Sequence, residues 1–254
     1  MRQIKVLAVV PARGGSKGVK NKNLIDIFGL PLLSYTISSI KQSKIITDFV
    51  ISSDSDAIVN TGLKYGACDI GLRPSDLSQD HSKTFDALKY SLKIFEEKFH
   101  NCDYILELQP TYPFRSKDLI DNALSTLFLK NWDSFTTVRP IVDTGHPDYV
   151  GKLSSNGSIV FNKSPNFFRR QELKPHYACI GSVMGAKVSH LKSGGDNLLV
   201  GVCGPVILEN QFEFFDINDV DDVTIANKIA ENNLIDTKIY SDFLNDYSSK
   251  FKIR

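Results

Sequence analysis

Short apolar runs alternate along the chain with longer segments whose apolar residues recur at helical spacing. The run at residues 6–10 is wholly apolar, which indicates a buried strand. Residues 84–99 instead carry Phe85, Leu88 and Leu92 on one face of an amphipathic helix. The same reading predicts strands at 6–10, 49–53, 104–108 and 134–138, and helices at 32–41, 56–66, 84–99 and 117–129.

The alternation of strand, loop and helix over residues 1–140 predicts an α/β fold. Its sheet is expected to be mostly parallel and covered by helices. Such sheets bind ligands at the carboxyl ends of their strands. Three loops there are rich in polar groups, at residues 11–23, 52–56 and 109–115. We therefore expect the functional site to form where these loops meet.

The pattern changes at residues 139–205, where short strand-like pieces are separated by turn residues. Asn156-Gly157 stands between two such pieces, which is a hairpin signal. We expect a β-rich insertion or lobe here. The helical pattern returns near the C-terminal end, where residues 216–219 precede a helix predicted at 220–229.

Composition excludes several classes of protein. The chain has 254 residues, 42% of them hydrophobic and 23% charged, as in ordinary globular domains. Its 30 Lys and Arg against 29 Asp and Glu give a net charge of +1, so neither a nucleic-acid surface nor a membrane surface is expected. No apolar run approaches the ~20 residues of a membrane span, and no signal peptide is indicated. The four cysteines form no C-x-x-C pair, so we expect a reduced, cytoplasmic protein: Cys68, Cys102, Cys179 and Cys203.

The loop after the first strand carries the clearest chemical signal. Residues 13–23 read RGGSKGVKNKN, which combines glycines with an arginine and three lysines. Glycines let the backbone approach an anion closely, and the cations add charge that suits a triphosphate. The loop matches neither the Walker pattern nor the dinucleotide pattern. The competing interpretation is a surface turn with solvated lysines.

Several motifs in a fixed order resemble the acylneuraminate cytidylyltransferases, which activate nonulosonic acids such as sialic, legionaminic and pseudaminic acid. With Arg170-Gln171, the resemblance covers nearly the whole chain. The motifs are VPARGGSKGVKNKN at 10–23, LPLL at 30–33, ISSDSD at 51–56, RPxxLxxD at 73–80 and QPTxPxR at 109–115.

The resemblance implies a Rossmann-like sheet of the nucleotide-diphospho-sugar transferase type. The nucleotide-binding domain would comprise residues 1–138 and 191–254. Residues 139–190 would form a small β-rich lobe on the sugar side that mediates homodimerisation. The substrates would be CTP and a 2-keto sugar acid, and the products a CMP-sugar and pyrophosphate. The anomeric hydroxyl would attack the α-phosphorus in line, so the protein's tasks are positioning and charge neutralisation.

The resemblance also assigns residues to the nucleotide. Arg13, Ser16 and Lys17 would surround the triphosphate, together with Gly14, Gly15 and Lys22 of the same loop. Asn23 and Arg73 would contact the cytidine side, and Thr84 stands where relatives have a residue that contacts the base. A helix-to-loop salt bridge is the alternative role for Arg73.

On the sugar side, the resemblance assigns Gln109, Thr111, Arg170 and Gln171. Gln109 follows the third strand, and its amide can both donate and accept hydrogen bonds. Arg13, Lys17 and Gln109 would be the catalytic residues. A solvated charge at the rim is the alternative for Arg170.

One departure from the family pattern lies on the sugar side. Ile180 and Met184 stand where the family has Asn and Tyr. This favours an unusual sugar acid or altered acyl substituents, unless Met184 simply packs in the core.

A second departure lies in the predicted metal site. The family has two aspartates where this chain has Asp216 and Asn218, which strand alternation would place on one face. These two would bind Mg²⁺ or Mn²⁺, with Asp219 as a possible substitute for Asn218. The alternative for Asp219, Asp221 and Asp222 is to cap and charge the start of the following helix.

Two other functions remain open on the sequence alone. The departures on the sugar side allow a nucleotidyltransferase with another acceptor, such as an octulosonic acid or a polyol phosphate. Asn218 allows a nucleotide-binding protein without catalysis.

Overall fold

The computed structural model describes residues 2–16, 18–141, 145–161, 173–236 and 240. Its centre is a six-stranded sheet in the order β10-β6-β9-β5-β1-β4. Five of these strands run in one direction and β9 runs against them. The mostly parallel α/β sheet predicted from the sequence is therefore confirmed. The strands are β1 (Val6–Pro11), β4 (Asp48–Ser52), β5 (Tyr104–Leu108), β6 (Ser134–Pro140), β9 (Tyr177–Lys187) and β10 (Cys203–Ile207).

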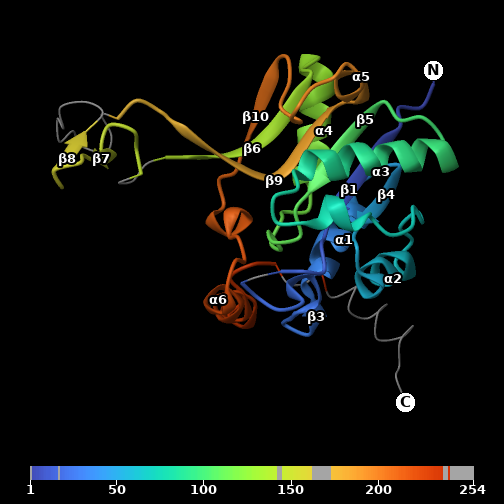
Figure 1. Ribbon diagram of the computed structural model, residues 1–254, viewed down its shortest axis with the longest axis horizontal. Coiled ribbons are helices and arrows are strands. Elements are labelled where there is room, and N and C mark those ends of the chain that lie inside the picture. The colour runs from blue at the N-terminus through green and yellow to red at the C-terminus, as the bar shows by residue number, and fades with distance from the viewer. Residues whose placement is uncertain (1, 17, 142–144, 162–172, 237–239, 241–254) are drawn as a thin grey trace.

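Helices cover both faces of the sheet, which gives three layers (Figure 1). One face packs against α1 (Leu32–Gln42), α2 (Asp56–Lys64) and α4 (Leu119–Lys130). The other packs against α3 (Thr84–Lys98) and the short α5 (Val188–Lys192).

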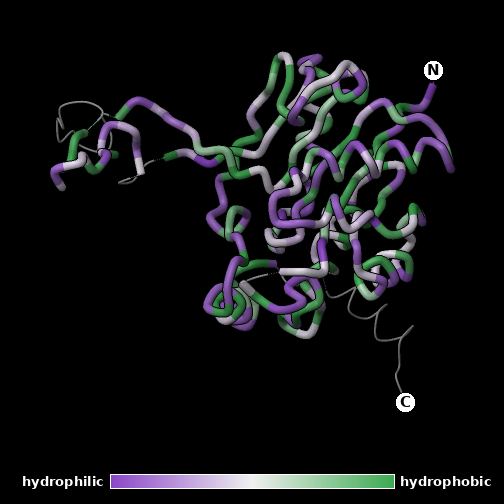
Figure 2. The backbone as a smooth tube through the Cα atoms, in the orientation of Figure 1, coloured by the Kyte–Doolittle hydropathy of each residue, from purple (hydrophilic) through white to green (hydrophobic). Residues whose placement is uncertain are grey.

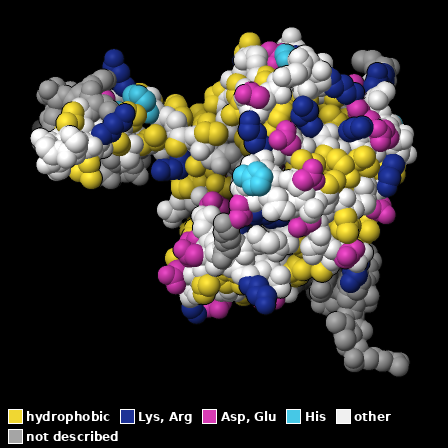
Figure 3. Space-filling view, in the orientation of Figure 1, with side chains coloured by type: hydrophobic (Ala, Val, Ile, Leu, Met, Phe, Trp, Pro, Cys, Tyr) yellow, Lys and Arg dark blue, Asp and Glu magenta, His cyan; other side chains and the backbone are white. Residues whose placement is uncertain are grey.

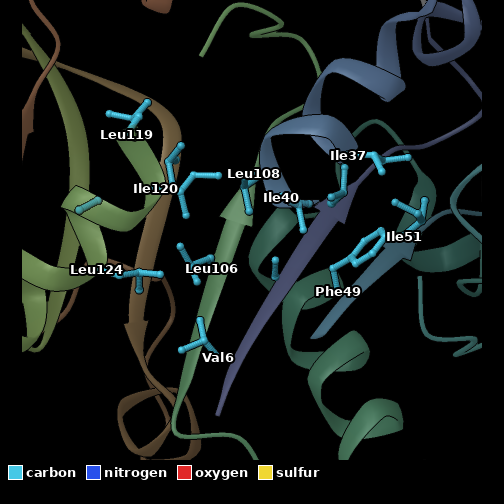
Figure 4. Close-up of a cluster of buried hydrophobic side chains, with 14 of the residues drawn as sticks. Val6, Ile37, Ile40, Phe49, Ile51, Leu106, Leu108, Leu119, Ile120 and Leu124 are labelled. Carbon is cyan, nitrogen blue, oxygen red and sulfur yellow. The ribbon is translucent and has the colours of Figure 1, made fainter. Parts of the chain in front are cut away.

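Alternation along the strands divides the core between the two faces. Leu106 and Leu108 of β5 point toward α1 and α4, among the side chains of Figure 4. Ile105, which precedes them in the strand, packs with α3 on the opposite face. By the same alternation Glu107 and Gln109 lie on the α3 face, where the end of β5 meets solvent.

A third apolar cluster lies beside the sheet and joins α6 (Val220–Glu231) to the hairpin of β2 (Asp26–Ile27) and β3 (Leu30–Pro31). Ile217 is fully buried in this cluster. Three short 3-10 helices also lie among the described residues: η1 (Lys22–Leu24), η2 (Ser75–Ser78) and η4 (Gln211–Phe214).

The start of α4 differs from the sequence prediction. The helix begins at Leu119 with Asp118 at its N-cap, not at residue 117 after a Ser116 cap. Ser116 instead donates its backbone N–H to Oε1 of Glu213, at 3.0 Å. No local pattern contains this long-range bond.

A β-hairpin projects from the sheet as an arm (Figure 1). It pairs β7 (Gly151–Leu153) with β8 (Ile159–Phe161), as the Asn156-Gly157 signal predicts. Gly157 has a φ of 83°, which glycine adopts without strain, and Asn156 Oδ1 accepts from the backbone N–H of Ser158.

The lobe predicted at residues 139–190 includes residues that belong to the sheet. Both ends of β9 pair with β6, with an irregularity between Thr136 and Val138, and its C-terminal half also pairs with β5. Its apolar residues resemble those of any strand, and pairing to distant partners is not visible in a local pattern. β9 (Tyr177–Lys187) of the central sheet thus lies within the range predicted for the lobe.

Apolar segments are short and distributed through the body (Figure 2). Among the described residues, no helix combines the length and apolar character that a membrane crossing requires.

Candidate active site

A cavity of about 510 Å³ opens at the carboxyl ends of β1 and β5. It is the place where the sequence predicts a ligand. Residues from the loops after both strands line it, together with the segment before α3. Of the predicted site residues, the cavity brings together Arg13, Ser16, Lys22, Asn23, Arg73, Thr84, Gln109, Thr111 and Asn218.

The loop after β1 is held open by its neighbours. Gly14 donates its backbone N–H to Oδ1 of Asp54 at 2.8 Å. Arg13 Nη1 pairs with Oδ1 of Asp80 at 2.7 Å, and Asn23 Nδ2 donates to the backbone oxygen of Arg13 at 3.0 Å. These bonds present the Arg13 guanidinium at the cavity. Gly14 and Gly15 belong to the same loop but do not line the cavity, and Lys17 lies outside the described residues.

The same loop packs against the segment before α6. Lys22 Nζ donates to the backbone oxygen of Ile217 at 3.0 Å. A Cβ at Gly18 would overlap the carbonyl oxygen of Asn218, so glycine is required for this approach. Burial lowers the pKa of Lys22, while the nearby carboxylate of Asp216 acts in the opposite direction.

The predicted metal ligands are neighbours. Asn218 Nδ2 donates to Oδ2 of Asp216 at 3.1 Å. The segment is not a strand, contrary to the sequence prediction, because Ile217 between them bonds instead to the oxygen of Thr111 and fills the third cluster. The two side chains nevertheless lie together.

The chemistry of this pair fits a hard divalent cation. Oδ1 of Asp216 is buried and has no hydrogen-bond partner among the described residues. Mg²⁺ takes one or two protein carboxylates and completes its shell with water and phosphate oxygens. The described residues contain no group of three or more His, Cys, Asp and Glu that could hold a metal.

The acidic residues that follow form a helix cap. Asp219 accepts from the backbone N–H of Asp222, and Asp222 accepts in return from that of Asp219, which is a capping box. Asp219 is thus committed to α6, as the structural interpretation of the sequence predicts. Asn218 and not Asp219 lines the cavity.

Arg73 is buried beside the cavity. Its Nε donates to Oγ of Ser78 at 2.9 Å, and burial lowers the pKa of its guanidinium. The bond to Ser78 replaces the salt bridge that the sequence left as an alternative. Thr84 is exposed at the first position of α3, at the cavity edge.

Gln109 is fixed through its main chain. Its N–H donates to the oxygen of Ser182 at 3.3 Å, and its carbonyl accepts from Nη2 of Arg115 at 2.5 Å. Arg115 is buried and also bonds Thr36 and the oxygen of Ser182, and burial lowers its pKa to about 10. Arg115 thereby joins the end of β5 to β9.

The two residues that depart from the family pattern are packing residues in the structure. Met184 packs against the core cluster beneath α3, as the alternative interpretation predicts. Ile180 packs against the opposite cluster, and its backbone oxygen accepts from Tyr112 Oη at 3.2 Å. Arg170 and Gln171 lie outside the described residues.

Sequence reasoning assigned no role to two acidic residues that line the cavity, although Asp80 ends the motif at 73–80. Asp80 pairs with Arg13, and nothing local indicates that pairing. Glu107 is 3% exposed at the end of β5, and burial raises the pKa of its carboxyl to about 7. A charged residue inside an otherwise apolar strand is a signal that could have found it.

The model of the cytidylyltransferase family matches residues 7–185, which include the loop after β1 and the end of β5. The chain belongs to the cytidylyltransferase family. It is 30% identical over 234 residues to the CMP-N,N'-diacetyllegionaminic acid synthase of Legionella pneumophila, covering 91% of this chain and 98% of that enzyme.

A second relative agrees with this assignment, and a solved structure shares the fold. A pseudaminic acid cytidylyltransferase of Campylobacter jejuni is 35% identical over 132 residues, which is 52% of this chain and 56% of that enzyme. The chain thus spans little more than half of that relative. Among solved structures, a CMP:2-keto-3-deoxy-manno-octonic acid synthetase complexed with CTP shares the fold. Its TM-score is 0.64 at 15% identity, and the match covers 90% of this cytidylyltransferase and 99% of that chain.

Proposed function

We propose that this cytidylyltransferase joins CTP to a nonulosonic acid and releases pyrophosphate. The observation that carries the proposal is the single cavity lined by Arg13, Lys22, Arg73, Gln109 and Asn218. It places cations, a buried guanidinium and an amide around one space at the carboxyl ends of the strands. Family relatives named for legionaminic and pseudaminic acid support this substrate class.

In this proposal the cavity positions two substrates and neutralises charge. The cations of the loop after β1, Arg13, Lys22 and Lys17, receive the triphosphate, along with Ser16 and the backbone of Gly14 and Gly15. Asn23, Arg73 and Thr84 bind the cytidine side. The anomeric hydroxyl of the sugar acid attacks the α-phosphorus, and pyrophosphate leaves. Such a reaction needs alignment and fixed positive charge more than covalent help from the protein.

We assign Gln109 and Thr111, which line the same cavity, to the sugar side. Arg170 and Gln171 belong to this side by resemblance. A guanidinium suits the carboxylate of the sugar acid because its fork matches two oxygens.

We propose Asp216 and Asn218 as the protein ligands of Mg²⁺ or Mn²⁺. The unpartnered Oδ1 of Asp216 supports this assignment. A divalent cation held there would offset negative charge on the triphosphate. Lys22, which bonds the backbone between the two ligands, would keep them aligned with the loop.

We also propose a homodimer formed through the arm, in a reduced compartment such as the cytoplasm. Support for the dimer comes from apolar side chains exposed on the arm (Figure 3). Support for the compartment comes from four cysteines without a disulfide among them.

Product analysis tests the proposed reaction. The enzyme is supplied with Mg²⁺, each of the four nucleoside triphosphates and one acceptor of each class, and products are identified by mass spectrometry. We expect a CMP-sugar from CTP and a nonulosonic acid. A product formed only from a polyol phosphate, or only with another nucleotide, would replace the proposal with a different transferase. CTP binding without any product would indicate a binding protein.

A further inference from the structure

A buried carboxyl group lines the cavity and has no part in the proposed reaction. Glu107 stands in β5, where its sheet neighbours are Val9 of β1 and Met184 of β9. Ala87 of α3, which lines the same cavity, is also uncharged. A carboxyl among such neighbours is costly unless it is hydrogen-bonded or neutral. We therefore expect the carboxyl of Glu107 to have a hydrogen-bond partner, and it has one.

That partner is Gln109, two residues along the same face of the strand. Its Nε2 donates to Oε1 of Glu107 at 3.2 Å. The main chain of Gln109 is held by Ser182 and Arg115, so rotation of the amide is the freedom that remains. Gly181, with a φ of 69°, leaves room beside that amide: a Cβ there would lie 3.9 Å from Nε2.

We propose that Glu107 is a positioning residue that sets which end of the Gln109 side-chain amide, Oε1 or Nε2, points toward the acceptor sugar. This inference rests on the proposed function, in which Gln109 lies on the sugar side. An ionised carboxyl can only accept, so it holds Nε2 and leaves Oε1 of Gln109 for a sugar hydroxyl. A protonated carboxyl can donate to Oε1 instead, and the amide then turns to present Nε2. Acceptor recognition therefore depends on the protonation of Glu107.

The charged groups around this pair do not set its titration. Burial is the main cause that raises the pKa of Glu107 to about 7, and the bond from Gln109 acts against it. The switch between the two amide orientations thus falls near neutral pH. The charged side chains that line the cavity are Arg13, Lys22, Arg73, Asp80 and Lys83, and the guanidinium of Arg115 is engaged by the backbone oxygens of Gln109 and Ser182.

Acceptor kinetics against pH provide the first test. At saturating CTP and Mg²⁺, we expect kcat/KM for the acceptor to fall toward tenfold per pH unit below about pH 7. Glu107→Gln should remove this pH dependence and keep the high-pH value, because a glutamine oxygen accepts from Nε2 at every pH. Glu107→Leu should also give a flat profile, but roughly tenfold lower, since the amide loses its partner.

Glu213→Gln is the matched control. Glu213 is also buried and accepts a backbone N–H, from Ser116, but does not line the cavity. It should keep the wild-type profile. A purely structural role for Glu107 would lower activity in both Glu107 variants without flattening the profile, and that result would overturn the proposal.

A second readout does not need turnover. The side-chain amide signal of Gln109 in the ¹⁵N NMR spectrum of the ligand-free protein, assigned with Gln109→Ala, should move with a midpoint near pH 7. It should stay fixed over the same range in Glu107→Gln. A signal that does not move in the wild type overturns the inference. Absence of turnover with every acceptor, beside a moving signal, would instead count against the proposed function.

Discussion

Arg13 reaches the cavity in an arrangement that its neighbours fix. Asp80 pairs with its guanidinium, and Asn23 bonds its backbone oxygen. The ion pair is partly exposed, so its own contribution to stability is small. Its effect is to hold a forked cation where phosphate oxygens can replace the carboxylate. At this scale, the site is built from side chains that position one another.

The buried carboxyl of Glu107 should make stability depend on pH. The pKa of Glu107 is higher in the folded protein than in the unfolded chain. The stability gained by keeping this carboxyl neutral is therefore fully present below about pH 4.5 and is lost as the pH rises to about 7. Relative to Glu107→Gln, the wild-type protein should lose roughly 3 kcal/mol of unfolding free energy across this window, then no more. Urea unfolding at pH 5 and pH 8 measures it. A difference between the two proteins that is equal at both pH values would contradict the shift.

Asp216 and Asp221 differ in role although they are close in sequence. Asp216→Asn should lower kcat about 100-fold or more, because it removes the single charge of the proposed metal pair. Asp221→Asn should stay within about twofold, since Asp221 is exposed in the first turn of α6, where it adds only to the helix dipole interaction. Pyrophosphate release at several Mg²⁺ concentrations checks both variants. An equal loss of kcat in the two variants would contradict the assignment of Asp216 as the metal ligand.

Residue types in motifs allowed most of the site to be predicted. Nine of the assigned residues line one cavity. Each of them lies in a loop at the carboxyl end of a strand, or in a segment next to such a loop. Asp80 and Glu107 were assigned no role, for different reasons. The first is defined by a contact across the fold. Glu107 indicates a functional position only once its burial is known, because an exposed glutamate would need no explanation.

At the scale of elements, the loop after β1 and the segment before α6 act as one unit. Gly18 lies against the carbonyl of Asn218, and Lys22 bonds the oxygen of Ile217. The triphosphate side and the proposed metal pair are therefore joined although far apart in sequence.

Gly18→Ala should separate these two segments. The added methyl overlaps a backbone atom that Ile217 anchors in the core, so a loss of about 1–3 kcal/mol in stability is expected, together with weaker CTP binding. Gly195→Ala is the control, because a Cβ there would meet its neighbours only at ordinary van der Waals distance, 3.5 Å or more, and Gly195 does not line the cavity. Thermal unfolding and calorimetry compare them. Similar behaviour of the two variants would show that the contact is unimportant.

Element identity was largely predictable because apolar periodicity records burial. The strands at residues 104–108 and 134–138, and the helices containing Leu88 and Ile37, occur as the pattern indicates. The antiparallel insertion of β9 was not, since strand direction depends on partners distant in sequence. The start of α4 also differed from the prediction, and there Ser116 bonds Glu213, which is far away in sequence.

At the scale of the whole molecule, the arm exposes apolar side chains that no part of the same chain covers among the described residues. Leu153 is 80% exposed, and Ile159 and Val160 are more than half exposed on the paired strand. Grouped apolar side chains on a projection are typical of a surface that another chain covers.

Leu153→Glu should therefore weaken the dimer. A charge at the proposed interface lacks a partner and would be desolvated, so sedimentation should show monomers where the wild type shows dimers. Lys130→Glu places the same charge on the exposed end of α4, away from the arm, and should leave the dimer intact. A wild-type protein that sediments as a monomer at every concentration would remove the dimer from the account.

The most direct measurement is pyrophosphate release with CTP and Mg²⁺ across legionaminic, pseudaminic, sialic and octulosonic acids. The account predicts release that requires both CTP and one nonulosonic acid, and that Arg13→Ala abolishes without loss of the fold. Release that is independent of the acceptor, or unchanged in Arg13→Ala, would contradict the central claim that this cavity carries out cytidylyl transfer.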